Sequence, residues 1–193
     1  MKIDPKFVVK VAGTLTVIAL VTAALLGLVD GVTRGPIAEI EAEKTRVAMS
    51  AVAPAGSEFT DKQEISAEVA AAAAAQGGKV LELYGVKAGG CVMKISASGS
   101  QGTIVMMVGV DANKAITGIS VVSHSETSGI GTKVVGNELN DAGVPVLDQF
   151  IGLSGSGSLV VKKNITPITA ATVSTKGITM GANAALAAAE VLG

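Results

Sequence analysis

The sequence is poor in the residues that usually build metal and cluster sites. It contains one cysteine, Cys91, and one histidine, His124. A single cysteine excludes an intrachain disulfide and an iron–sulfur or zinc site built from cysteines of this chain. The acids scattered around one histidine have no metal-ligand spacing, so we predict no metal site. Cys91 is expected to be a small buried hydrophobic side chain.

Aromatic residues and an excess of either charge are also lacking. Tryptophan is absent, and aromatic residues make up 2% of the chain. The 15 basic and 16 acidic residues nearly balance, so the sequence shows no electrostatic footprint of a nucleic-acid-binding protein. With 193 residues, the chain can hold one domain and an appendage.

A long uncharged segment is present near the N-terminus. Val11–Val29 contains 19 residues without a charge, close to the roughly 20 that a helix needs to cross a bilayer. Its apolar core is longer than that of a signal peptide, which favours an uncleaved membrane span. The lysines that precede it, Lys2, Lys6 and Lys10, place residues 1–10 in the cytoplasm by the positive-inside rule, with the rest of the chain on the outer face of the cell membrane.

Residues 30–78 are predicted to form a helical connector that packs on the outer domain. Gly35-Pro36 is expected to end the membrane helix, because proline disrupts a helix interior. Ile37–Val52 has the apolar spacing of an amphipathic helix. Thr60–Gln76 runs into a series of alanines, the strongest helix formers, and is predicted to be a second helix.

Residues 79–193 are predicted to form one α+β domain. Short segments rich in Val and Ile alternate with turns rich in Gly, Ser and Asp, which indicates strands of an antiparallel meander. The expected strands are Lys79–Lys87, Cys91–Ser98, Gly102–Val110 and Ile116–Ser123. Because these strands precede a helical tail, helices and sheet should form separate layers.

The segments after this meander are expected to add smaller elements and a final helix. We predict a short helix at Thr132–Leu139, a last strand at Ser158–Lys163 and a helix at Ile178–Leu192. Apolar side chains before the last strand are expected to point inward: Leu147, Phe150 and Ile151. The final helix has one small apolar face for packing on the sheet, made of Ile178, Ala182, Ala185, Leu186 and Ala189.

A segment rich in hydroxyl groups precedes the final helix. Thr166–Thr175 reads Thr-Pro-Ile-Thr-Ala-Ala-Thr-Val-Ser-Thr. A turn of small residues that opens a helix can bind an anion, because free N–H groups and the helix dipole point there. Lys176, in or next to the first turn, is unfavourable for the dipole unless an anion is also present. The alternative is a Ser or Thr N-cap with spare hydroxyls.

A second loop, His124–Lys133, contains two glycines that could let the backbone approach a ligand closely, Gly129 and Gly131. The alternative is an ordinary loop between a strand and a helix. In that case His124 would be a structural hydrogen-bonding residue and Glu126 a solvated charge. The residues by themselves leave both alternatives open.

Together these two segments resemble a known family. Thr169-Ala170-Ala171-Thr172 resembles the Ser/Thr-Gly/Ala-Ala-Thr flavinylation motif of FMN-binding domains in the G subunit of the Rnf electron-transport complex and in the C subunit of the sodium-pumping NADH:quinone reductase. His124–Lys133 is similar to the His-x-Glu-Thr-Pro-Gly-Leu-Gly loop of that family. Thr166 stands where the family usually has Asp, Ala170 where Gly is common, and Ser128 where Pro is common.

The resemblance implies FMN linked to Thr172 through a phosphoester bond that a separate flavin transferase makes. It implies that the flavin neighbours are Thr169, Ala170, Ala171, Val173, Ser174 and Lys176 near the attachment, and His124, Glu126, Thr127, Gly129 and Gly131 in the loop. Aliphatic and methionine side chains would have to pack the ring, because aromatic residues are so few. The implied fold is one N-terminal transmembrane helix followed by one antiparallel-sheet FMN-binding domain with flanking helices.

The resemblance further implies an electron-relay subunit without catalytic residues of its own. The complex would be a membrane-bound Rnf assembly that moves electrons between ferredoxin and NAD⁺ and couples this to ion transport, with its other subunits as partners. Two alternatives remain open from the sequence. One is the C subunit of the quinone reductase, and the other is a membrane-anchored binding or assembly protein without a redox cofactor.

Overall fold

The computed structural model describes residues 5–54 and 56–192. The chain divides into two compact units, residues 1–43 and residues 44–193. Residues 1–4 of the expected cytoplasmic N-terminus, Lys2 among them, lie outside the described residues.

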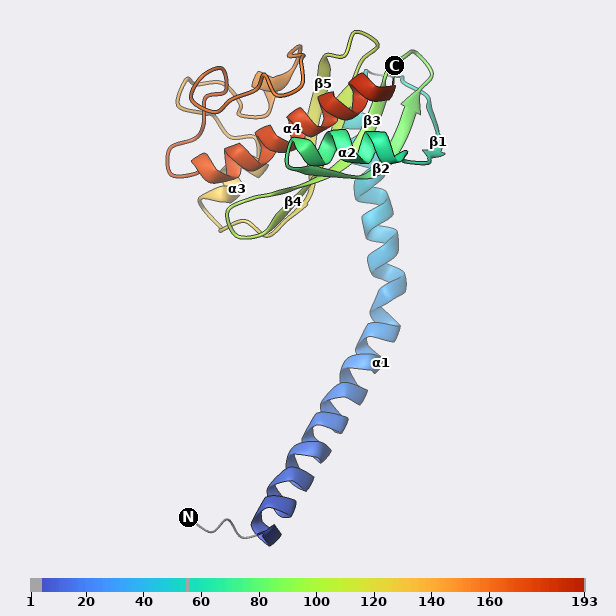
Figure 1. Ribbon diagram of the computed structural model, residues 1–193, viewed down its shortest axis with the longest axis vertical. Coiled ribbons are helices and arrows are strands. Elements are labelled where there is room, and N and C mark those ends of the chain that lie inside the picture. Colours follow the sequence, from blue (N-terminus) through green and yellow to red (C-terminus); the bar gives the residue numbers. More distant parts are fainter. Residues whose placement is uncertain (1–4, 55, 193) are drawn as a thin grey trace. The chain divides into compact units, whose positions relative to one another are not determined.

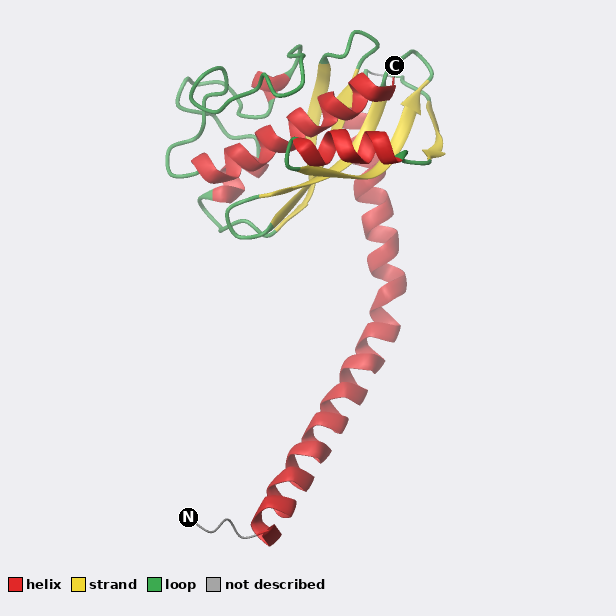
Figure 2. Cartoon of the chain, in the orientation of Figure 1, coloured by secondary structure: helices red, strands yellow, loops and turns green. Residues whose placement is uncertain are grey.

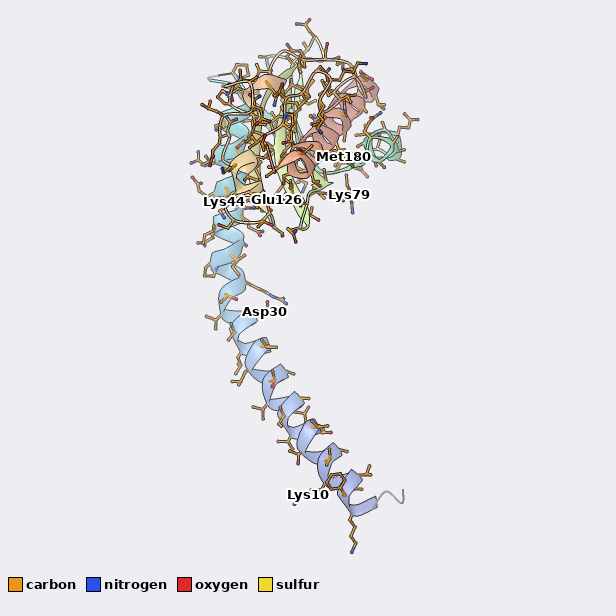
Figure 3. All side chains as sticks on the ribbon, turned by 90° about the vertical axis from the view of Figure 1, so that its left-hand side faces the viewer. Lys10, Asp30, Lys44, Lys79, Glu126 and Met180 are labelled. Carbon is orange, nitrogen blue, oxygen red and sulfur yellow. The ribbon has the colours of Figure 1, made fainter. Side chains whose placement is uncertain are left out.

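Helix α1 (Pro5–Val52) contains the long uncharged segment. Its large apolar side chains between Phe7 and Val32 are exposed, and Lys10 and Asp30 bound the uncharged stretch (Figure 3). The helix is long and apolar enough to cross a membrane. Side chains that no part of the chain buries suit a lipid environment, so the described residues supply one candidate membrane span.

The predicted end of this helix at Gly35-Pro36 is wrong. Helix α1 continues through Pro36, so the expected separate helix Ile37–Val52 is its C-terminal part. A proline in a helix interior removes one backbone hydrogen bond and costs about 3 kcal/mol. The helical turns on both sides of Pro36 are long enough to outweigh that local loss.

The second unit contains a five-stranded antiparallel sheet in the order β1-β2-β3-β4-β5 (Figure 2). The strands are β1 (Phe59–Gln63), β2 (Gly78–Val86), β3 (Cys91–Ser98), β4 (Thr103–Val110) and β5 (Ile116–His124). Each strand pairs with the next along the chain, so the predicted meander is confirmed. Helices flank this one sheet, which confirms the predicted α+β class.

The first strand was not expected, because Thr60–Gln76 was predicted to be a helix. Phe59 of β1 pairs with Val86 of β2, and the helix α2 (Ala67–Ala75) begins only after Ser66. The Ser66 hydroxyl caps α2 by accepting a hydrogen bond from the Val69 N–H at 3.3 Å. Strand β1 is polar and mostly exposed, as suits an edge strand, and its sequence therefore lacks the apolar alternation of a strand.

Both faces of the sheet are covered. Met106 and Met107 are neighbours on β4, so their side chains point to opposite faces, and both are fully buried. Helices α2 and α4 (Thr172–Leu192) lie side by side on one face, with Met106 in the core beneath them (Figure 1). The last turns of α1 cover the other face, where Met107 packs with Met49 and Val52.

Helix α4 approaches the sheet closely at two glycines. A Cβ atom at Gly177 would lie 2.6 Å from the Ser98 carbonyl oxygen, and one at Gly181 would lie 2.6 Å from the Met106 Cε. The five apolar residues predicted for its inner face are all buried. The helix begins at Thr172, six residues before the predicted start at Ile178, so only the end of the hydroxyl-rich segment, Thr172–Thr175, forms its first turn.

The segment between β5 and α4 is mostly irregular. It contains only a short helix α3 (Gly131–Val135), smaller than the predicted Thr132–Leu139, and a 3-10 turn at Asp148–Phe150. Leu147 and Phe150 are buried as expected, but Ile151 is 54% exposed, so the inward orientation predicted for it is wrong.

The last strand predicted at Ser158–Lys163 is not formed. The segment makes one isolated bridge, between Val161 and Ile165, and Lys162 has a left-handed φ of 68° that interrupts extended backbone. A buried amide from α4 holds the segment instead. The Asn183 side chain accepts a hydrogen bond from the Leu159 N–H at 3.3 Å and donates one to the Leu159 carbonyl at 2.9 Å.

Cys91 begins β3 and packs against the main core, although it is only partly buried. Burial raises the pKa of its thiol to about 11, and Lys114 lowers it by a smaller amount. A thiol with so high a pKa is protonated at neutral pH, which agrees with the predicted role as a small apolar side chain.

Candidate functional site

The N-terminus of α4 has no side-chain cap. Ala171 occupies the N-cap position, because its carbonyl accepts the first helical hydrogen bond, from the Thr175 N–H at 3.0 Å. An alanine side chain has no oxygen with which to accept a bond from the first turn, so the alternative of a Ser or Thr N-cap is wrong. Among the described residues, the N–H groups of Thr172, Val173 and Ser174 have no hydrogen-bond partner.

The first turn of α4 divides into an inner and an outer side. Ser174 and Thr175 are buried, Thr172 is half-buried, and Val173 and Lys176 are exposed. Residues four apart on a helix are neighbours on its surface, so Lys176 lies next to Thr172. The Thr172 hydroxyl has no hydrogen bond within the described parts of the chain. A negatively charged group on this hydroxyl would therefore meet three free N–H groups and one ammonium group.

A tight turn leads into this helix. The Ala171 N–H donates to the Ile168 carbonyl at 2.9 Å, and Ala170 has a φ of 68°. A positive φ at the third residue is the mark of a type II turn, in which glycine is preferred because it has no Cβ. This conformation explains why the related motif commonly has glycine where this chain has Ala170.

Asp141 holds the second residue of that turn. Its carboxylate accepts the Thr169 N–H at 2.9 Å and the Thr169 hydroxyl at 2.8 Å. The Asp141 N–H also donates to the Pro167 carbonyl at 3.2 Å. Sequence reasoning missed this residue, because only its place in an Asp-Ala-Gly turn distinguishes it and that signal says nothing about Thr169.

Glu126 joins the two sequence motifs. Its side chain is 8% exposed, so the alternative that it is a solvated charge is wrong. The carboxylate accepts hydrogen bonds from the Ser100 N–H at 2.7 Å and the Gln101 N–H at 3.4 Å, and from the Ser174 hydroxyl. It thus connects the turn between β3 and β4, the loop after β5 and the first turn of α4. Because its oxygens are occupied by these donors, Glu126 holds the site together from within.

Two glycines make room for this carboxylate. A Cβ atom at Gly99 or at Gly131 would collide with the Glu126 side chain, and at Gly131 it would also lie 2.9 Å from the Ser174 hydroxyl oxygen. Gly131 is buried, so it serves the packing around Glu126. Gly129 differs, because it is exposed and has a left-handed φ of 76°.

The remaining loop residues are held by contacts within their own loop. His124 Nδ1 accepts the Glu126 N–H at 3.2 Å, and the Thr127 carbonyl accepts the Thr132 N–H at 3.3 Å. The Gly129 N–H donates to the Thr132 hydroxyl at 2.9 Å. Within the described residues, no hydrogen bond joins His124, Thr127 or Gly129 to the first turn of α4. The structure therefore brings Glu126 and Gly131 to that turn, and it leaves the other three exposed on the loop.

The site lies within a recognisable domain. A family model described as the FMN-binding domain matches residues 99–187. The match begins at the glycine beside Glu126 and includes both sequence motifs and most of α4.

Proteins similar over most of the chain carry closely related names. The G subunit of the Na⁺-translocating ferredoxin:NAD⁺ oxidoreductase complex of Acetobacterium woodii is 31% identical, over 95% of this chain and 92% of its own length. The G subunit of the ion-translocating oxidoreductase complex of Methanosarcina acetivorans is 28% identical, over 91% of this chain and 90% of its own length. The protein of the same name from Cereibacter sphaeroides is 31% identical over 74% of each chain.

Proposed function

Because the chain belongs to the G-subunit family of ion-translocating oxidoreductase complexes, we propose that it is an electron-relay subunit of a membrane-bound ferredoxin:NAD⁺ oxidoreductase and carries FMN on Thr172. The observation that carries the proposal is the uncapped N-terminus of α4, with Thr172 as its first helical residue, inside the segment that matches the FMN-binding domain. The names of the relatives, all G subunits, favour this assignment over the C subunit of a quinone reductase.

The first turn of α4 fits a phosphodiester on Thr172. The free N–H groups of Thr172, Val173 and Ser174 are donors for phosphate oxygens, and the positive end of the helix dipole faces the same place. Lys176 would add a charge-assisted hydrogen bond from the neighbouring turn. The same lysine opposes the dipole when no anion is present, so its position is best explained by a permanent negative charge on Thr172.

The described residues supply no base positioned to activate Thr172. An unassisted threonine hydroxyl is a weak nucleophile, and no carboxylate or imidazole of the described residues hydrogen-bonds to Thr172. A separate flavin transferase would therefore supply the base and an activated flavin nucleotide. In that step the Thr172 oxygen bonds to the phosphorus of the activated flavin nucleotide, and the bond from that phosphorus to the rest of the donor breaks. The leaving group takes up the Thr172 proton, and the chain gains the mass of FMN less one water.

Once attached, FMN would supply reversible electron transfer, and the protein would supply position and environment. The contacts of Glu126 would fix the loop after β5 beside the attachment point. Exposed apolar side chains near it, Val173 and Ile130 among them, are the aliphatic surfaces available to a flavin ring in a chain with so few aromatic residues. The proposal requires no substrate site and no general base of this chain.

Helix α1 would anchor this relay in the cell membrane. Lys6 and Lys10 precede its uncharged segment, and with Lys2 they support an orientation with the N-terminus in the cytoplasm. The FMN-binding domain would then lie on the outer face, in the periplasm or outside the cell. Its partners would be the other subunits of the complex and, during maturation, the flavin transferase.

The test is the covalent mass of the protein co-expressed with a flavin transferase. We expect the denatured chain to keep flavin fluorescence, and its Thr166–Lys176 region to carry the mass of one FMN less water. Thr172→Ala should abolish both signals, because the attachment oxygen is lost. Thr103→Ala, the same chemical change at an exposed strand residue, should keep them. Flavin that washes out on denaturation, or that remains on the Thr172→Ala chain, contradicts attachment at this position.

A further inference from the structure

Asp141 makes contacts that tie a distant turn to the segment before Thr172. Its carboxylate accepts both the N–H and the hydroxyl of Thr169, at 2.9 and 2.8 Å, and its own N–H donates to Pro167. Three hydrogen bonds thus join one residue to a segment about 28 positions later in the chain. A single residue with three such bonds restricts both the position and the direction of the backbone that it holds.

The segment held by Asp141 leads directly to the proposed attachment point. Thr169 is the second residue of the turn closed by the bond from Ala171 N–H to Ile168 carbonyl. The Ala171 carbonyl then accepts the first helical bond of α4. Because these hydrogen bonds follow one another along the backbone, restricting the position of Thr169 also restricts the position of the Thr172 hydroxyl.

Asp141 is itself on a turn closed by several hydrogen bonds. The neighbouring Asn140 is 6% exposed, and its side-chain oxygen accepts the N–H groups of Ala142 at 2.9 Å and Val144 at 3.1 Å. The Gly143 N–H donates to the Asn140 carbonyl at 2.9 Å. A buried amide that organises its own turn makes Asp141 a fixed support for the Thr169 turn.

We propose that Asp141 is a positioning residue for the modification of Thr172. It holds the turn at Thr169 so that the Thr172 oxygen enters the transferase in the geometry that attack on phosphorus requires. This inference rests on the proposed function, because it needs Thr172 to be the attachment residue. Asp141 touches neither the reacting oxygen nor phosphorus, so its effect passes through Thr169.

The experiment compares FMN attachment in full-length chains supplied with the same flavin transferase and flavin nucleotide donor. Asp141→Ala should lower kcat for attachment by about tenfold or more, because small displacements of a reacting group have large kinetic effects. Asp141→Asn keeps one acceptor oxygen and should fall between wild type and Asp141→Ala. Asp148→Ala is the matched control, since this exposed acid of the same region bonds Asn137 at 2.8 Å and does not contact the Thr169 turn. Its kcat should stay within about twofold of wild type.

A second variant tests the same contact from the other side. Thr169→Val removes the hydroxyl that donates a hydrogen bond to Asp141. The double variant should therefore lose less kcat than the two separate losses combined predict. Thermal unfolding of the unmodified chains identifies any variant that is unfolded at the assay temperature. If Asp141→Ala is unfolded at that temperature, the kcat values of Thr169→Val and Asp141→Asn test the role of Asp141 in its place.

The outcomes separate this inference from the proposed function. A wild-type chain that stays unmodified beside an active transferase contradicts the proposed function, and the role of Asp141 with it. A wild-type chain that is modified, together with an Asp141→Ala chain modified equally fast, contradicts only the role of Asp141. An Asp141→Ala chain with a raised KM and an unchanged kcat also overturns positioning, because it makes Asp141 a surface contact of the transferase.

Discussion

The two ends of helix α4 differ in their charged side chains and in the hydrogen-bond partners that the rest of the chain supplies. At the C-terminus, the Lys114 ammonium donates to the Ala189 carbonyl at 2.7 Å, and it places a cation where the helix dipole favours one. Glu190 is an acid at the unfavourable end, but the Ser156 N–H and hydroxyl donate to it at 2.9 and 2.6 Å and hold its pKa below the usual range. At the N-terminus, Ala171 provides no cap and Lys176 opposes the dipole.

The missing cap is therefore a feature of the N-terminus of α4 and not of the whole helix. At the C-terminus of the same helix a lysine side chain donates to the Ala189 carbonyl, so the chain is able to supply a partner to a helix end. Ser174 and Thr175 lie in the first turn, but their hydroxyls bond to Glu126 and to the Ala171 carbonyl. The free N–H groups thus remain available to a ligand, as expected where a functional site departs from local rules of stability.

The largest effect should come from removing Glu126, which holds the open end of α4 to the sheet. Glu126→Ala leaves the Ser100 N–H and the Ser174 hydroxyl without their acceptor in a buried place, at a cost of about 2–3 kcal/mol in free energy of unfolding. Urea unfolding of the unmodified chain measures it. Glu138→Ala, at an exposed acid, is the control and should change stability by less than about 0.5 kcal/mol. Equal stability of the two variants would show that Glu126 is dispensable for holding α4.

The sequence predicted the parts of the fold that depend on local patterns. Four strands of the meander, the apolar segment of α1 and the inner face of α4 follow from the spacing of apolar residues, and the structure confirms them. Strand β1 was missed because its side chains are polar, and its pairing with β2 depends on a neighbour about 20 residues later. The false strand at Ser158–Lys163 had strand-like composition, but no neighbouring strand pairs with it in the described sheet.

The site could be predicted only where a motif marks it. Thr172 and the loop after β5 were chosen as candidates from the sequence, but the burial of Glu126 was not predicted. Its partners Ser100 and Ser174 lie 26 and 48 positions away, and no local pattern shows that three segments meet at one carboxylate. The contact between Asp141 and Thr169 spans 28 positions, and it was not predicted for the same reason.

A smaller effect should come from the turn that leads into the open end. Ala170 has a left-handed φ of 68°, which costs a residue with a Cβ atom about 1–2 kcal/mol. Ala170→Gly removes this strain but adds backbone entropy to the unfolded chain, so we expect a net gain of about 0.5–1 kcal/mol by urea unfolding. Ala71→Gly, the same change at an exposed position inside α2, should instead lose about 1 kcal/mol. A loss at both positions would contradict the strained turn.

The smallest expected change in free energy of unfolding concerns one lysine near each end of α4. The two lysines should differ in the sign of that change. Lys176→Gln should raise the stability of the unmodified protein by about 0.3–1 kcal/mol, since it removes a cation from the positive end of the dipole. In the FMN-bearing protein the same change should lower stability, because the phosphodiester on Thr172 then loses a neighbouring positive charge. Lys114→Gln should lower stability in both forms, since the Ala189 carbonyl loses its donor whatever Thr172 carries.

Thermal unfolding of both variants, each with and without attached FMN, measures these signs, and added salt should weaken both effects of Lys176. A Lys176→Gln change of the same sign in both forms would mean that the charge on Thr172 does not reach Lys176. The free N–H groups would then be the only contacts that the open end of α4 offers to the phosphodiester. A reversal of sign at Lys176 beside a constant sign at Lys114 would instead tie the difference between the two ends to the modification itself.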